Sequence, residues 1–256
     1  MPQYMKAYIS NRLIEVSQHS VLPPTIRHSL GGRKPSSNQS IEKYEHNQKI
    51  SINRARKNIR RLLECNFTDQ YAFVTLTFKS TEDVDITDIS SCKKMFADFK
   101  KRLAYYLKNN NLPDFKYLGV TEFQDKNRYG AIHYHLICNL TEVSLEDLQN
   151  IWGYGWVGKE ITTSNPTDNK KIAFYLNKGI SDPRLNGHKR YFHSHGLKQP
   201  IALEIKNPSE FYEHLTKCRP SQQYDNTYQS RYTGESKYVE YYVENVKELL
   251  DYVQEL

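Results

Sequence analysis

Two histidines at alternate positions of a short apolar run constrain the fold of this chain most strongly; they lie in the segment GAIHYHLICN at residues 130–139. Successive side chains of a β-strand point to opposite faces of the sheet. His133 and His135 therefore share one face. Three residues suited to a core share the other face: Ile132, Tyr134 and Leu136. The segment predicts a strand with two metal-capable imidazoles side by side, backed by an apolar surface.

The composition indicates a folded protein with a polyanionic partner. Of the 256 residues, 38% are hydrophobic and 12% are aromatic, which argues against wholesale disorder. The net charge is +7 and the sequence pI is about 9.0, so nucleic acid is the expected partner. No apolar run approaches the ~18 residues of a membrane-spanning helix, and the four cysteines include no CxxC pair. We expect a cytoplasmic protein with no membrane partner.

Hydrophobic periodicity predicts alternating strands and helices within a main domain at residues 46–206. The expected strands are 71–79, 115–124, 130–138, 156–162 and 201–205, and the expected helices are 89–110, 144–153 and 169–180. A loosely ordered N-terminal arm at 1–45 precedes this domain. A tyrosine-rich extension at 207–256 follows, with a hairpin around Thr233 and Gly234 and a terminal helix. The order predicts an α+β fold: a central, mainly antiparallel sheet with helices packed on one face.

Residues 41–64 predict a basic amphipathic helix ahead of the first strand of that domain. Residues 49–61 within it carry six basic side chains and no acidic one. The apolar stripe of the helix comprises Ile41, Tyr44, Ile52, Ile59, Leu62 and Leu63. Given the overall charge, we expect phosphate contacts from this helix rather than a merely solvated face. The candidate DNA contacts are Arg54, Arg56, Lys57, Arg60 and Arg61.

The strand before the histidines adds a carboxylate to the predicted site. The two strands are joined by DKNRY, which predicts a hairpin. In a hairpin centred near residue 127, Glu122 faces His133. Two imidazoles and one carboxylate leave open coordination positions and suit Mn²⁺, Mg²⁺, Fe²⁺ or Zn²⁺. Gln124, on the same strand face as Glu122, is a reserve ligand.

A reactive partner for this site follows in the segment KKIAFYLNKG. Lys171, Tyr175 and Lys178 lie at i, i+4 and i+7, on one face of the expected helix, while Ile172 and Leu176 suit the core. The unperturbed pKa of a tyrosine is about 10, and nearby positive charge favours the nucleophilic phenolate. Tyr175 is therefore the candidate nucleophile, and Lys171 is a further candidate DNA contact. The Tyr-x-x-Lys pattern is weak alone and gains weight from the His-x-His strand before it.

Three segments, in this order, resemble the motifs of HUH endonucleases with one catalytic tyrosine: VTLTF (74–78), GAIHYHLI (130–137) and YLNK (175–178). TEFQ, the Trp-Gly pair at 152–153 and SHGLKQP (194–200) more specifically resemble rolling-circle replication initiators of bacterial plasmids and phages, the group that includes filamentous-phage gene II-like proteins. The resemblance covers roughly residues 50–205. It implies the RRM-like sheet of HUH endonucleases.

The resemblance also implies roles for individual residues. His133 and His135 would be metal ligands, Glu122 the third ligand and Tyr175 the nucleophile, with Mn²⁺ or Mg²⁺ as cofactor. Lys178 matches the motif lysine that places or neutralises the scissile phosphate. The implied reaction nicks single-stranded or cruciform origin DNA in a bacterial host, leaving a 5′-phosphotyrosine and a 3′-OH. A host helicase and a DNA polymerase would be partners.

Two departures from that family leave the second cleavage open. Gly179 stands where some members carry a second tyrosine, and Lys171 stands where others carry a glutamate. A second protomer in a homodimer, another acid and water are the alternatives for that step.

Two further motifs suggest other sites but fit them poorly. FHSHG (192–196) has no apolar strand to hold its histidines rigidly, and GYGWVGKE (153–160) has Glu160 where a phosphate-binding loop needs Ser or Thr. Neither a second metal site nor an ATPase is expected. Three rival functions stay open: a single-tyrosine transposase, a non-enzymatic single-stranded nucleic-acid-binding protein and a two-His-one-carboxylate iron oxygenase. A relaxase usually places its tyrosine before the histidines, unlike this chain.

Overall fold

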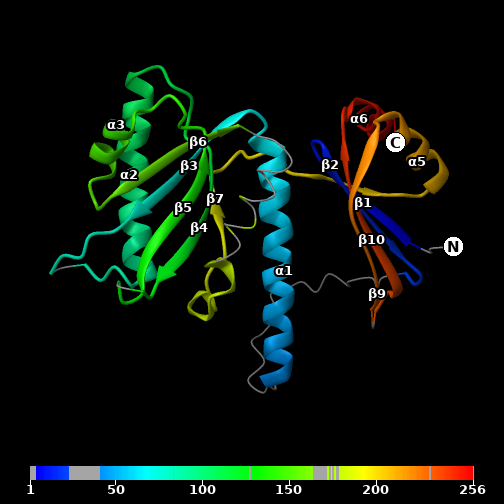
Figure 1. Ribbon diagram of the computed structural model, residues 1–256, viewed down its shortest axis with the longest axis horizontal. Coiled ribbons are helices and arrows are strands. Elements are labelled where there is room, and N and C mark those ends of the chain that lie inside the picture. Colours follow the sequence, from blue (N-terminus) through cyan, green and yellow to red (C-terminus); the bar gives the residue numbers. More distant parts are fainter. Residues whose placement is uncertain are drawn as a thin grey trace, which may run out of the picture. The chain divides into compact units, whose positions relative to one another are not determined.

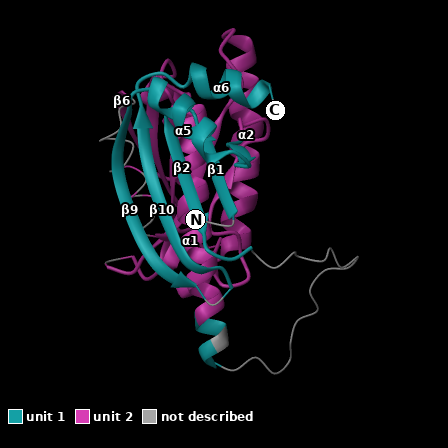
Figure 2. Cartoon of the chain, turned by 90° about the vertical axis from the view of Figure 1, so that its right-hand side faces the viewer, with its two compact units in different colours: residues 1–45, 199–256 teal, residues 46–198 magenta. Residues whose placement is uncertain are grey.

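The chain divides into two compact units, each built around one five-stranded antiparallel sheet (Figure 2). The computed structural model describes residues 4–22, 41–82, 84–126, 128–163, 172, 174, 176, 179–230 and 232–255. One unit combines the two chain ends, residues 1–45 and 199–256, and the other comprises residues 46–198. The α+β class expected from the sequence is confirmed.

The sheet of the 46–198 unit has the strand order β6-β3-β5-β4-β7 (Figure 1). Its strands are β3 (Gln70–Thr77), β4 (Tyr117–Gln124), β5 (Ala131–Cys138), β6 (Val157–Thr163) and β7 (Phe192–His193). β4 and β5 form the expected hairpin, whose turn ends at Gly130 with a φ of +84°, a conformation that costs glycine least. The histidine-bearing strand β5 therefore lies at the centre of the sheet.

Two helices cover the face of this sheet that carries Tyr134: α2 (Ile89–Asn109) and α3 (Leu145–Trp152). α3 begins after a serine cap, where Ser144 Oγ accepts a hydrogen bond from the backbone N–H of Asp147 at 3.0 Å. Trp152 at its other end is fully buried, and its Nε1 donates to the carbonyl of Thr77 at 2.8 Å. The Trp-Gly pair thus ties the end of α3 to the end of β3.

The opposite face is partly covered by α1 (Ile41–Asn66), the expected basic helix. Its residues Ile59, Leu62 and Leu63 are buried against sheet residues that include Leu118 and Ile137. From the sequence we expected helices on only one face of this sheet. α2 and α3 share one face, but α1 lies on the opposite face. The apolar stripe of α1 is also shorter than expected, because Ile41 is 78% exposed and Tyr44 is 44% exposed.

The unit formed by the chain ends has the strand order β8-β1-β2-β10-β9. Its elements are β1 (Tyr4–Ser10), β2 (Leu13–His19), β8 (Ile201–Glu204), α5 (Pro208–Lys217), β9 (Pro220–Ser230), β10 (Gly234–Val243) and α6 (Lys247–Gln254). The C-terminal hairpin and helix are as expected. The prediction of a loosely ordered N-terminal arm is wrong for residues 4–19, which form β1 and β2. The expected strand at 201–205 is β8, and it pairs with β1 rather than with the histidine-bearing sheet.

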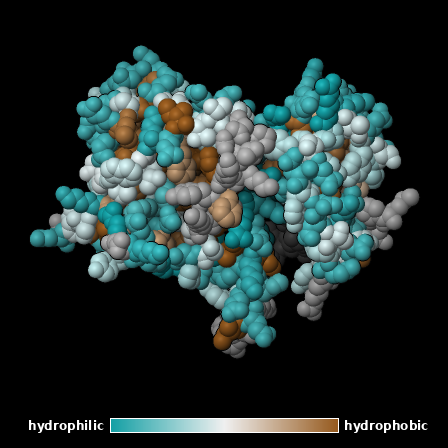
Figure 3. Space-filling model, in the orientation of Figure 1, coloured by the Kyte–Doolittle hydropathy of each residue, from teal (hydrophilic) through white to brown (hydrophobic). Residues whose placement is uncertain are grey.

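Hydrophilic residues cover most of the surface seen in Figure 3, with hydrophobic residues scattered among them. Among the described residues, no helix combines the length and the apolar character needed to cross a membrane.

Candidate functional site

The three candidate metal ligands lie together on the sheet face that α1 partly covers. The pairing of β4 with β5 sets Glu122 opposite His133, the register expected from the hairpin. The carboxylate reaches diagonally to the second histidine, and 2.5 Å separates Glu122 Oε2 from His135 Nε2. His133 is 9% exposed and His135 is 5% exposed, so both imidazoles sit in the sheet rather than in bulk water.

β3 holds the ring of His135 in a defined orientation. Thr75 pairs with His135 across the ladder, and its Oγ1 lies 3.1 Å from Nδ1 of the imidazole. The ring of Phe73 stacks on the same imidazole at 5.8 Å between centroids and 15° between planes. With Nδ1 engaged by Thr75, Nε2 is directed at Glu122. VTLTF is recognisable as a motif in the sequence, but the role of Thr75 within it depends on strand pairing and was not predicted.

His133 is held differently. Its Nε2 is buried and has no hydrogen-bond partner among the described residues, an arrangement that costs roughly 1–3 kcal/mol for a polar group. Burial lowers the pKa of His133 to about 4; the positive charge of Arg128 adds to the shift and Glu122 opposes it. The imidazole is therefore neutral at pH 7, which is the form that coordinates a metal.

The donor set fits a divalent metal, although the side chains do not surround one as they stand. Within the described ranges, no group of three His, Cys, Asp or Glu side chains is arranged to hold an ion. The direct contact of Glu122 with His135 occupies the space that an ion would need between them. The Glu122 side chain is 36% exposed, so its χ rotation can open this space without disturbing the core. The buried Nε2 of His133 is the atom that such an ion would satisfy.

The predicted nucleophile Tyr175 lies outside the described residues, as do Lys171 and Lys178. Among the described residues of the same segment, Ile172 and Leu176 pack on the histidine-bearing face of the sheet. Leu176 is helical and fully buried in the cluster that also contains Val120 and Ile137. The core-facing role expected for Ile172 and Leu176 is confirmed.

Gly179 fixes the end of this segment against β4. A Cβ on Gly179 would lie 2.4 Å from the carbonyl oxygen of Thr121 and 3.3 Å from Cα of Glu122. Only a residue without a side chain permits such an approach. Gly179, which stands where some family members carry a second tyrosine, thus lets the chain pass close to the candidate ligand Glu122.

The candidate DNA contacts on α1 differ in their access to solvent. Arg54, Arg56 and Lys57 are exposed, and Arg60 is half-buried. Arg61 is only 8% exposed, so little of its side chain is accessible to a phosphate.

The two motifs set aside in the sequence take other places. His195 and His193 are exposed, with the buried Ser194 between them. GYGWVGKE runs into β6 at Val157, so it leads into a strand as expected. Its Gly155 packs against β3, where a Cβ would lie 2.3 Å from the carbonyl oxygen of Thr77.

Residues 71–181 match the model of a family described as Replication-associated protein ORF2/G2P. The matched segment runs from β3 past the Tyr-x-x-Lys motif and includes both histidines and Glu122. This part of the chain is therefore similar to replication-associated proteins. No curated protein and no solved structure matches the chain.

Proposed function

We propose that this chain is a rolling-circle replication initiator, a metal-dependent endonuclease of the HUH type that nicks one strand of its origin through Tyr175. The main support is the constellation of Glu122, His133 and His135 on two paired strands. Leu176, next to Tyr175, packs on the same sheet face, with Gly179 against β4. The match of residues 71–181 to a replication-associated family supports a role in replication.

Each residue of the site has a task in this reaction. His133 and His135, with Glu122, would hold Mn²⁺ or Mg²⁺, which when bound polarises a non-bridging oxygen of the scissile phosphate. Thr75 keeps the second imidazole in place. Tyr175 attacks phosphorus in line, so a Tyr–O–P bond forms while the bond from phosphorus to the 3′ oxygen breaks. The 3′ oxygen leaves and takes a proton. Lys178 neutralises the phosphate during this exchange.

The products account for a role in initiation. The free 3′-OH primes a polymerase, and the 5′-phosphotyrosine stores the bond energy for rejoining the strand. In-line attack needs a phosphate clear of a regular duplex, so single-stranded or cruciform origin DNA is the proposed substrate. A host helicase and polymerase in the bacterial cytoplasm complete the machinery, and a homodimer is one way to supply the second cleavage.

A nicking assay on end-labelled single strands from the protein's own locus tests this proposal. With Mn²⁺ we expect one cut, whose 3′-OH fragment a polymerase extends. His133→Ala with His135→Ala abolishes the cut, whereas His46→Ala, at an exposed position outside the site, leaves it intact. Tight DNA binding without any cut, across several metals and strands, would indicate a DNA-binding protein without endonuclease activity. A cut at the ends of a mobile element instead of an origin would indicate a transposase.

A further inference from the structure

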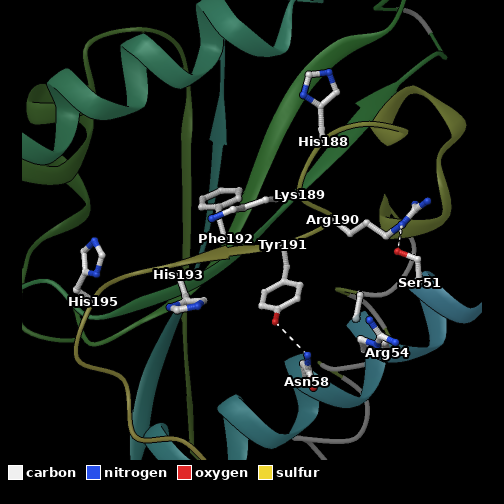
Figure 4. A pocket seen from close by; sticks show the side chains of 11 residues that line it. Ser51, Arg54, Asn58, His188, Lys189, Arg190, Tyr191, Phe192, His193 and His195 are labelled. Carbon is white, nitrogen blue, oxygen red and sulfur yellow. Dashed lines mark hydrogen bonds between the residues drawn. The ribbon is translucent and has the colours of Figure 1, made fainter. Parts of the chain in front are cut away.

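A pocket of about 500 Å³ lies between α1 and the chain at residues 188–195, within the 46–198 unit (Figure 4). Its volume is in the range of small-ligand sites, roughly 300–1,000 Å³. None of the described residues that line it is Asp or Glu, and none belongs to the His133, His135 and Glu122 site. Six of the lining residues are basic or carry an imidazole: Arg54, His188, Lys189, Arg190, His193 and His195. The lining therefore suits an anion.

The cations of the pocket are of two kinds. Arg54 and Lys189 are exposed and able to reach a ligand. Arg190 is 8% exposed and is held in the wall, where its Nη1 donates to the carbonyl of Ile180 at 2.5 Å and its Nε to Ser51 Oγ at 3.4 Å. Guanidinium and ammonium groups arranged in this way bind phosphate oxygens through charge-assisted hydrogen bonds.

Aromatic rings form another side of the same pocket. Tyr191 and His193 alternate along the chain, and their rings lie 6.1 Å apart and within 24° of parallel. Figure 4 shows Tyr191 reaching toward α1, where Asn58 Nδ2 donates to its hydroxyl at 3.3 Å. Phe192, between them, packs into the core on the other side of the sheet. Rings held side by side in this way offer faces on which nucleic-acid bases stack.

We propose that this pocket binds one nucleotide of single-stranded DNA, with its phosphate at Arg54 and Lys189 and its base against Tyr191 and His193. A base inside a duplex is stacked between its neighbours and does not enter a pocket, so the ligand is a single strand. The choice of DNA rests on the proposed function. The pocket shares no residue with the candidate metal site. It is therefore a second binding site, which contacts the strand at a nucleotide other than the one that is cut.

This inference is tested by measuring how tightly the full chain binds a labelled oligothymidylate of twelve nucleotides, by fluorescence anisotropy at several salt concentrations. EDTA is present, so no metal-dependent cleavage occurs. Arg54→Ala with Lys189→Ala should flatten the plot of log affinity against log salt by about 0.7, since both side chains contact one phosphate and each phosphate neutralised on a single strand contributes about 0.7. Lys93→Ala with Lys94→Ala on α2 makes the same change in net charge at exposed positions and should leave the slope within error of the wild type.

The aromatic side has its own matched pair. Tyr191→Leu should weaken binding about 5- to 100-fold through loss of base stacking, whereas Tyr191→Phe, which keeps the ring, should not. Equal effects of the two double variants on the salt slope would overturn the proposal, and so would equal affinities of the Leu and Phe variants. Thermal melts that match the wild type show that each variant is folded. Because EDTA prevents metal-dependent cutting, this outcome is independent of whether the chain proves to be a nickase.

Discussion

His135 is the most firmly held residue of the candidate site, and the reason lies in one hydroxyl on the neighbouring strand. Thr75 engages Nδ1, Phe73 stacks on the ring, and Nε2 is left facing Glu122. Residues that orient a ligating histidine through its other nitrogen commonly govern metal affinity 10- to 100-fold. The site therefore depends on a residue that need not touch metal or DNA.

Replacing that hydroxyl tests its role. Thr75→Val keeps the shape of the side chain and removes the hydrogen bond to His135. We expect Mn²⁺ affinity, measured by isothermal titration calorimetry, to fall about 10- to 100-fold. Thr162→Val on β6 is the control and should bind Mn²⁺ like the wild type. Unchanged affinity of the Thr75→Val variant would show that the second imidazole is positioned without this bond.

The buried His133 makes stability depend on pH in a defined window. Its pKa is lowered to about 4 in the folded chain, mainly by burial, and an unfolded histidine titrates near 6.5. Between these values the unfolded state binds more protons, so the free energy of unfolding falls as pH falls from 6.5 toward 4. We expect His133 to contribute a loss of about 2 kcal/mol between pH 7.5 and pH 5.

Urea unfolding in EDTA at these two pH values measures this loss. The His133→Gln variant should lose about 2 kcal/mol less than the wild type over the same interval. His195→Gln, at an exposed position, should behave like the wild type. Identical pH dependence in all three proteins would mean that His133 titrates normally in the folded chain.

At the scale of the elements, the hairpin of β4 and β5 was predictable and the packing of α1 was not. The short connection between two strands fixes their register, so Glu122 could be placed opposite His133 from the sequence alone. The basic pattern of α1 indicated a DNA-facing helix, yet it carried no information on which basic residue is buried. Arg61 is nonetheless buried. The roles of Thr75 and Gly179 depend on contacts between strands and segments, which local patterns do not encode.

Gly179 holds the end of the segment that contains the Tyr-x-x-Lys motif close to β4. Gly179→Ala places a Cβ 2.4 Å from the carbonyl of Thr121, so the segment must shift away from Glu122. We expect the free energy of unfolding to fall by about 1–3 kcal/mol and the nicking rate to fall with it. Gly187→Ala meets no atom within 4 Å, so its positive φ of 84° should cost only about 1–2 kcal/mol of backbone strain and leave nicking intact. Full nicking by the Gly179→Ala variant would show that the close contact of Gly179 with β4 is not needed for activity.

At the scale of the whole molecule, the two chain ends build one unit around a shared sheet. β2 pairs with β10, so that Val16 lies opposite Val239 across more than 200 residues of sequence. The core of this unit likewise draws on both ends, with Ile9 and Phe211 among its buried residues. Local periodicity carries no information about so distant a partner, and the first residues therefore looked like an arm. The fold of the 46–198 unit was more accessible, because a short hairpin joins its strands β4 and β5.

Deleting residues 1–22 tests the shared sheet. Without β1 and β2, strand β8 loses its partner and β10 keeps only β9. We expect hydrogen–deuterium exchange of β9 and β10 amides to rise to the rate of an unfolded chain, while β3, β4 and β5 stay protected by their own core. Protected β10 amides in the truncated chain would contradict the shared sheet, and loss of protection in β5 would contradict two separate units.

The most direct test of the central proposal is a covalent-adduct assay. The full chain is incubated with labelled single-stranded DNA from its own locus and Mn²⁺, and the mixture is run on a denaturing gel. We expect a slow-migrating protein–DNA band that disappears in Tyr175→Phe, in His133→Ala with His135→Ala, and with a chelator. Trypsin should leave the DNA on the peptide 172–178, in which Tyr175 is the one tyrosine. A band that persists in Tyr175→Phe, or the absence of any band from a chain that binds the same DNA tightly, would contradict cleavage through Tyr175.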